Sequence, residues 1–138
     1  MKINGIYSDI TIDVNFEDSD KECIFLSPSG TGKTFLFGIL IEYLREMGIT
    51  AVLINSTLLN NLHNDITNIE KSCLDNDVQI VILDNADLYL TQEFLDALLE
   101  HGKKVIISLK NESRFSFQNF GFYRVKYSEK NLNVRRKL

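Results

Sequence analysis

A short run of small and polar residues, ending in a lysine and a threonine, carries the clearest chemical signal in the sequence. Residues 27–34 read Ser-Pro-Ser-Gly-Thr-Gly-Lys-Thr, and apolar residues precede and follow them. A strand that enters such a loop and a helix that leaves it direct successive backbone N–H groups inward, where they bind phosphate. Lys33 can then reach the terminal phosphates of a nucleotide, and the Thr34 hydroxyl can bind Mg²⁺. The pattern predicts a triphosphate site.

A second chemical element lies further along the chain. Residues 80–83 are Ile-Val-Ile-Leu, and Asp84 follows them. A buried strand that ends in a carboxylate delivers it to the sheet edge where a phosphate loop lies, and there it can hold Mg²⁺ directly or through water. A lysine in the first turn of a helix is otherwise unfavourable, because the helix dipole disfavours cations there unless an anion is bound. Because the Asp84 carboxylate and the Thr34 hydroxyl would both lie at the phosphate loop, we expect these two residues to be the metal ligands.

These two elements resemble the Walker A and Walker B motifs of P-loop NTPases. The loop departs from the Walker A pattern at Ser27, which stands where the first glycine is expected. The resemblance implies ATP and Mg²⁺ as cofactors. The nucleotide-binding residues that it implies are Ser29, Gly30, Thr31, Gly32, Lys33, Thr34 and Phe35.

The elements that must position these residues alternate between strand and helix patterns from residue 22 to residue 109. Apolar runs predict strands at 23–26, 50–54, 78–83 and 105–109, and helical spacing predicts helices at 33–47, at 57–74 and between Thr91 and Gly102. Alternation of this kind indicates an α/β fold with a mostly parallel sheet. Period-two patterning at 10–16 adds an extra N-terminal β segment, and one more strand is expected near 122–127. With the motifs, this predicts the three-layer P-loop NTPase fold.

The strands that flank Asp84 indicate the branch of the superfamily. A strand between the two motifs and another after the second are similar to the additional-strand branch, which includes AAA, RecA-like and ABC-type ATPases. In such folds the later strand lies between the two motif strands and ends in a polar sensor of the γ-phosphate. Ser108 or Asn111 would take that role, unless each is an ordinary polar residue at a strand end. The sequence contains no LSGGQ, NKxD or DxxG pattern, which disfavours ABC transporter subunits and GTPases, and adenine is the family's default base.

Hydrolysis is a separate question, because Asn85 stands where these ATPases usually carry a glutamate that polarises water. An amide can orient a water molecule but cannot accept its proton, and loss of a general base costs about 10²–10⁴ in rate. The expected catalytic residues are Lys33 and Asn85, and we expect Asp87 to cap the helix that follows. The candidates for an arginine finger are Arg114, Arg124, Arg135 and Arg136.

Charge is unevenly distributed along the chain. Residues 1–102 hold five Lys and Arg against 17 Asp and Glu, whereas residues 103–138 hold ten against two, in a protein of net charge −4. The 138 residues are expected to form a single nucleotide-binding domain, with its core at 22–111 and a basic, aromatic-rich segment at 112–138. That segment is either a partner surface, for nucleic acid or for the acidic face of another subunit, or a solvated tail that pairs with the acidic body.

The sequence as a whole predicts an ATP-binding protein with slow or partner-dependent hydrolysis, which acts as a nucleotide switch. Two alternatives stay open: a degenerate P-loop scaffold without turnover, and a small phosphotransferase with residues 111–121 as its lid. The partners expected besides nucleotide are an unidentified protein or a second copy of the chain. No apolar run approaches the roughly 20 residues that span a bilayer, and the N-terminus lacks a signal pattern, so a cytoplasmic location without membrane contact is expected. Cys23 and Cys73 are expected to be free, buried thiols.

Overall fold

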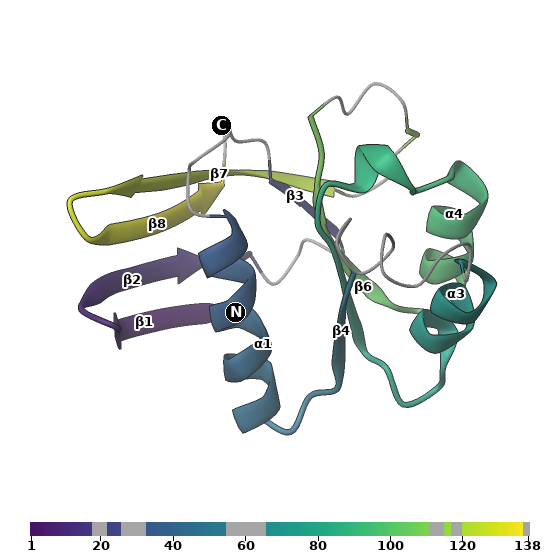
Figure 1. Cartoon of the computed structure of the whole chain (residues 1–138), viewed down its shortest axis with the longest axis horizontal. Helices are drawn as coiled ribbons and strands as arrows, with labels where there is room; N and C mark the ends of the chain where they lie inside the picture. The colour runs from purple at the N-terminus through teal and green to yellow at the C-terminus, as the bar shows by residue number, and fades with distance from the viewer. Residues whose placement is uncertain (18–21, 26–32, 55–65, 111–114, 117–119, 137–138) are drawn as a thin grey trace.

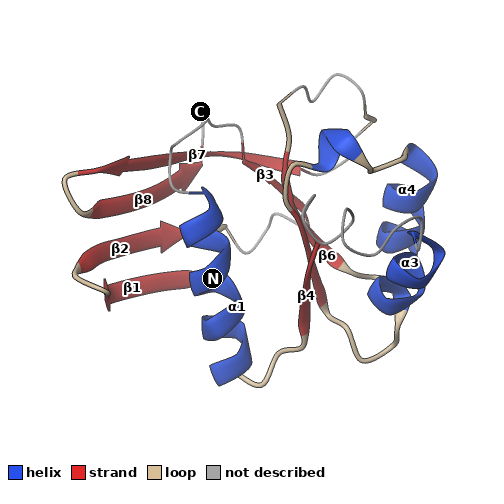
Figure 2. Ribbon diagram, viewed as in Figure 1, coloured by secondary structure: helices blue, strands red, loops and turns tan. Residues whose placement is uncertain are grey.

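The chain folds around one eight-stranded mixed sheet. The computed structural model describes residues 1–17, 22–25, 33–54, 66–110, 115–116 and 120–136. The strand order is β1-β2-β8-β7-β3-β6-β5-β4 (Figures 1 and 2). The strands are β1 (Lys2–Tyr7), β2 (Ile10–Asn15), β3 (Glu22–Phe25), β4 (Ala51–Ile54), β5 (Ile80–Leu83), β6 (Lys104–Ser108), β7 (Phe120–Ser128) and β8 (Asn131–Arg136). The helices are α1 (Lys33–Glu46), α3 (Ile66–Leu74), the 3₁₀ helix η1 (Ala86–Leu88) and α4 (Gln92–Glu100).

Strands β3, β6, β5 and β4 form the parallel half of the sheet, and helices cover both of its faces. In β5, Ile80 and Ile82 pack into the core on the side of α1, whereas Val81 and Leu83 pack into the core on the side of α3 and α4. Figure 1 shows α1 on one side of these strands and α3 and α4 on the other. A strand covered on both faces needs an unbroken apolar run, which explains why β5 carries four buried residues in succession.

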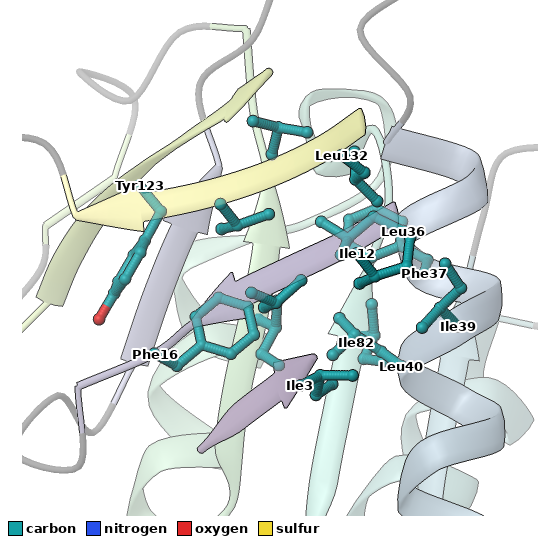
Figure 3. Close-up of a cluster of buried hydrophobic side chains, with 14 of the residues drawn as sticks. Ile3, Ile12, Phe16, Leu36, Phe37, Ile39, Leu40, Ile82, Tyr123 and Leu132 are labelled. Carbon is teal, nitrogen blue, oxygen red and sulfur yellow. The ribbon is translucent and has the colours of Figure 1, made fainter. Parts of the chain in front are cut away.

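The remaining strands form the hairpin half of the sheet. The β1–β2 and β7–β8 hairpins are antiparallel, and they join through the parallel pair β2–β8. Strand β7 also pairs in parallel with β3, which connects the two halves. One face of the hairpin half packs on α1, and Figure 3 shows Ile12, Leu132 and Leu40 converging in that core. Tyr123 and Phe16 meet edge to face there, with ring centroids 5.1 Å apart.

The helix boundaries follow local signals in the sequence. Gly48 and Gly102 have φ values of 74° and 72° at the ends of α1 and α4, a left-handed conformation that glycine adopts without strain. Thr91 caps α4, because its hydroxyl oxygen accepts a hydrogen bond from the Phe94 N–H at 3.1 Å. In the described part of the chain no helix is long and apolar enough to cross a membrane.

The structure confirms the mixed α/β class and the parallel alternation of the central region, and it adds two strands. Strand β1 precedes the predicted N-terminal strand. Strand β8 lies in the basic C-terminal segment, for which a solvated tail is one of the two interpretations of the charge pattern. Residues 120–136 are therefore built into the sheet, and the tail interpretation is wrong for them. The first part of the helix predicted at 57–74, up to residue 65, lies outside the described residues.

Candidate functional site

The candidate site lies at the carboxyl ends of β6 and β5, where the first residue of α1 meets them. In the sheet β6 lies between β3 and β5, so the strand at 105–109 is located between the two motif strands, as the sequence led us to expect. Leu83 pairs with Ile107, and continuation of this register places Asp84 beside Ser108. Carboxyl ends of parallel strands are the usual place for ligands in open α/β sheets.

Lys33 reaches this edge from α1. Its ammonium group Nζ donates a hydrogen bond to Ser108 Oγ at 3.1 Å. Ser108 is fully buried, and its hydroxyl in turn hydrogen-bonds the Asp84 carboxylate. The three polar side chains thus form a connected chain, from ammonium through hydroxyl to carboxylate. Side chains that are held in this way are oriented before any ligand arrives.

Asp84 carries a carboxyl group that is mostly withdrawn from water, with 9% of its surface exposed. Burial raises the pKa of Asp84, while the positive charge of Lys33, the Asn85 backbone N–H and the Ser108 hydroxyl act in the opposite direction. Because the effect of burial is the largest, the ionised carboxylate is less favourable here than in water. A cation bound beside Asp84 would therefore recover more free energy than one bound to a solvated carboxylate.

Asn85 follows directly and has a left-handed backbone, with φ 52° and ψ 48°. It precedes the 3₁₀ helix η1 and is half-exposed. Asparagine is one of the few residue types that enter this conformation readily. The turn therefore gives a structural reason for an asparagine at this position, in addition to any contact with water.

Asp87 has a different role from the one that we expected. Its carboxylate oxygen Oδ2 accepts a hydrogen bond from the Lys110 backbone N–H at 2.5 Å, and the cap of α4 is Thr91. The prediction that Asp87 caps the following helix is therefore wrong. The physical reason is that η1 lies between Asp87 and α4, which directs the carboxylate toward the chain that leaves β6.

Tyr89 is a residue of the site that sequence reasoning missed. Its hydroxyl oxygen lies 2.8 Å from the Asp84 carbonyl oxygen and 3.0 Å from the Ile54 carbonyl oxygen, so it ties the carboxyl ends of β5 and β4 together. Burial raises the pKa of Tyr89, and the negative charge of Asp84 raises it further. The hydroxyl therefore stays protonated and available as a donor. No local pattern marks a tyrosine at this spacing, because the contact depends on strand pairing.

Several predicted residues fall where the structure gives no account. Ser29, Gly30, Thr31 and Gly32 lie outside the described residues, as do Asn111 and Arg114, and the Thr34 side chain is not described. Phe35 is half-buried and packs against the core around α1. A role in contacting nucleotide stays a prediction for these residues.

The remaining candidates for an arginine finger lie in the hairpin half of the sheet. Arg124 alternates with Tyr123 and Val125, which belong to the core on the side of α1, so Arg124 lies on the opposite face from Lys33 and Ser108. Arg135 forms an ion pair with Asp13. Arg136 is exposed near the end of β8. The described residues thus bring Lys33, Ser108 and Asp84 together without an arginine.

Residues 115 and 116, which belong to the segment 111–121 considered as a phosphotransferase lid, pack against α4 and the core beside it. Phe115 is buried in the core on the side of α3 and α4. The Gln92 side-chain amide binds the Ser116 backbone at both ends: Oε1 accepts from the N–H at 2.8 Å, and Nε2 donates to the carbonyl at 3.2 Å. Phe115 therefore acts as core, which removes it as a substrate clamp.

Cys73 is a free thiol and fully buried, as the sequence predicted. Burial raises its pKa to about 12, so the thiolate form is negligible at neutral pH. The Cys23 side chain is not described. A comparison of the sequence with protein-family models gives no match, and no curated protein matches it either.

Proposed function

We propose that this chain is a P-loop nucleotide-binding domain of the additional-strand type, and that it binds MgATP. The observation that carries the proposal is the convergence of Lys33, Ser108 and Asp84 at one edge of the sheet. Strand order supports it as well, because β6 lies between the strand that precedes the predicted phosphate loop and the strand that ends at Asp84. Two sequence motifs and one spatial contact thus point to the same edge.

The residues at this edge suit a triphosphate and a hard cation. Lys33 is an ammonium in the first turn of α1, where the helix dipole disfavours a cation unless an anion lies near it, and a phosphate would add to the charge of Asp84. Mg²⁺ takes oxygen ligands, usually one or two carboxylates together with phosphate oxygens and water, and Asp84 supplies such a carboxylate. In this proposal Thr34 and Asp84 hold the metal and Lys33 contacts the terminal phosphates. The bound metal would supply charge neutralisation for the phosphates.

Turnover is proposed to be slow or dependent on a partner. Asn85 can orient a water molecule through its amide, but it cannot accept a proton from it. The described residues of the site contain no arginine, so among them Lys33 is the one cation placed to offset charge that develops during phosphoryl transfer. The protein would therefore act as a switch, in which nucleotide state changes the loops after β5 and β6. The left-handed backbone of Asn85 favours the alternative of a scaffold without turnover, because it explains the asparagine without catalysis.

Binding is tested by calorimetric titration with ATP in the presence of Mg²⁺. We expect saturable binding that Lys33→Ala weakens by at least about 100-fold, because the proposed charge-assisted contact of the half-buried ammonium with phosphate is lost. Lys71→Ala is the matched control, since Lys71 is exposed on α3 and should have no effect. An affinity that Lys33→Ala leaves unchanged would overturn the proposal.

Turnover is tested with three variants at one position. Asn85→Gly keeps the left-handed turn and removes the amide, whereas Asn85→Asp and Asn85→Glu supply a carboxylate. If Asn85 orients water, phosphate release falls in Asn85→Gly and rises in at least one carboxylate variant, with ATP affinity maintained. If all three release phosphate at the rate of the unaltered protein, Asn85 only forms the turn, and the scaffold interpretation is favoured where that common rate equals the protein-free background.

A further inference from the structure

The hairpin half of the sheet leaves one face open to solvent, and its side chains share a distinctive chemistry. Buried residues of the core around α1 alternate with outward residues along most of these strands, at Ile3, Ile12, Val14, Tyr123, Val125, Leu132 and Val134. We call the outward set the open face. It consists of Lys2, Asn4, Ile6, Thr11, Asp13, Asn15, Arg124, Lys126, Ser128, Asn131, Asn133 and Arg135.

Four cations on this face gather toward one end of the strands. Arg124 lies directly opposite Arg135, and Lys2 lies opposite Asn15. Continuation of the β2–β8 register brings Asn15 beside Arg135, so Lys2, Arg135 and Arg124 form a row across the four strands. Neighbouring strands are about 4.8 Å apart, so the row extends over roughly 14 Å. Lys126 lies two residues beyond Arg124 on the same strand.

This positive charge is only partly neutralised within the molecule. Asp13 is the single acidic residue of the open face, and it is already engaged by Arg135 through both its carboxylate and its backbone carbonyl. Within the described residues, the charged groups of Lys2, Arg124 and Lys126 have no side-chain hydrogen bond or ion pair. Like charges directly opposite each other on antiparallel strands are destabilising, and Asp13 offsets this only at Arg135, so an anion bound beside Arg124 would relieve the remaining repulsion.

The rest of the face is suited to hydrogen bonding rather than to apolar contact. Four asparagines, Thr11 and Ser128 supply neutral donors and acceptors, and Ile6 is the one large apolar side chain on the face. None of the exposed side chains of this face is aromatic, since Tyr127 alternates onto the other side. Stacking on unpaired bases, which dominates single-strand recognition, is therefore not available here.

We propose that the open face binds the phosphate backbone of a nucleic-acid duplex. Paired cations and amides on a solvent-exposed sheet match the contacts that proteins make with phosphates and sugars, which fix a protein on a duplex without reading its sequence. The net charge of the chain is −4, so the cations are concentrated on this face against the overall balance of the protein. The surface is formed by strands rather than by a tail, and it does not depend on the nucleotide site at the carboxyl ends of β5 and β6.

Binding is tested by fluorescence anisotropy with a labelled 20-base-pair DNA duplex, in a salt series and without nucleotide. Four phosphate contacts predict a slope of log affinity against log salt of about −3.6. Arg124→Thr with Lys126→Thr preserves strand-forming residues, and we expect it to lower affinity at least about tenfold and to reduce the slope by about 1.8. An RNA duplex of the same sequence should behave alike, and a single strand should bind more weakly.

The control is a double variant that loses the same charge elsewhere. Arg45→Ala with Lys71→Ala removes two exposed cations, one on α1 and one on α3, and should leave both affinity and slope nearly unchanged. The proposal is overturned if this control weakens binding as much as the open-face variant, since net charge alone would then explain the effect. It is also overturned if the protein binds phosphatidylserine vesicles and not the duplex, or if no duplex binding occurs at low salt.

Discussion

The parallel half and the hairpin half of the sheet differ in what their strands can display. Helices cover both faces of the parallel half, so β5 and β6 are apolar along their length, and their polar groups occur where the strands end. Only one face of the hairpin half is covered, so its polar residues alternate along the strands. Polar chemistry is therefore concentrated at an edge in the first half, at Ser108 and Asp84, and spread over a surface in the second.

Helix α1 packs against both halves of the sheet, so truncation of one of its core side chains should have the largest effect on the free energy of unfolding. Leu40 is fully buried, in a core that includes Ile82 of β5 and Leu132 of β8. We expect Leu40→Ala to lower the free energy of unfolding by about 3 kcal/mol, because a cavity replaces the side chain. Urea unfolding followed by circular dichroism and by tyrosine fluorescence should give a single transition. Two separate transitions would contradict the view that the halves unfold together, and Glu42→Ala is an exposed control on the same helix.

The two halves also differ in how their cations are placed. In the parallel half, Lys103 is a buried cation at the amino ends of the strands, whereas the cations of the hairpin half are exposed. The Lys103 ammonium donates to the Asp75 and Val78 carbonyl oxygens at 2.5 and 2.6 Å. Lys103→Met keeps the length of the side chain and leaves two carbonyls without that donor, so we expect a loss of about 2 kcal/mol in thermal or urea unfolding. The exposed cations of the hairpin half should tolerate the same change, and Arg124→Met provides the comparison. Equal losses at both positions would show that burial does not distinguish them.

Substitution of Asp84 should raise the free energy of unfolding rather than lower it, by less than the loss expected at Lys103. Burial raises its pKa, so the folded protein binds this proton more tightly than the unfolded chain does. The resulting stability is fully present below the ordinary aspartate pKa and is lost as pH rises through the raised value. We expect Asp84→Asn to be more stable than the unaltered protein at pH 7 and to lose that advantage below about pH 4, in urea unfolding at several pH values. A gain that does not change with pH would contradict the assignment, and Asp77→Asn is an exposed control.

The turns of the hairpin half should give the smallest effect. Glu129 and Lys130 have φ values of 49° and 62°, and Ser8 and Asp9 have 50° and 64°. Two-residue hairpin turns of this kind favour Asn-Gly, because other residues are strained at positive φ. We expect Glu129→Asn with Lys130→Gly to raise stability by about 1 kcal/mol, measured by thermal unfolding. Lys130→Ala cannot relieve the strain and should give no gain, so an equal gain from it would contradict the explanation.

The sequence predicted the parallel half well, because apolar runs, Thr91 and the glycines after the helices are strong local signals. The hairpin half was predicted only in part. Strand β8 has two buried residues, Leu132 and Val134, among polar ones, and neither hairpin turn carries the Asn-Gly signal that would have joined its strands. Pairing with distant strands, rather than local preference, makes these segments strands.

The residues of the candidate site show the same contrast between those that local sequence patterns mark and those that strand pairing brings together. Lys33 and Asp84 stand out because motif spacing marks them, and Ser108 could be named because it is a polar residue near the end of the strand predicted at 105–109. Tyr89 could not, since its contacts with the Ile54 and Asp84 carbonyls arise from the side-by-side arrangement of β4 and β5. The same applies to Asp87, whose partner is Lys110 on the far side of β6.

The seam between β2 and β8 has a consequence for the order of folding. Each hairpin joins strands that are adjacent in sequence, and such hairpins form in about 1–10 μs. Pairing of β2 with β8 instead closes most of the chain into a loop: Thr11 donates to the Lys130 carbonyl at 2.8 Å, and Arg135 contacts Asp13 across 122 positions of sequence. The entropy of that closure must be lost before the seam returns any contact energy. The two hairpins should therefore form early and separately, and their joining should be among the last steps in folding.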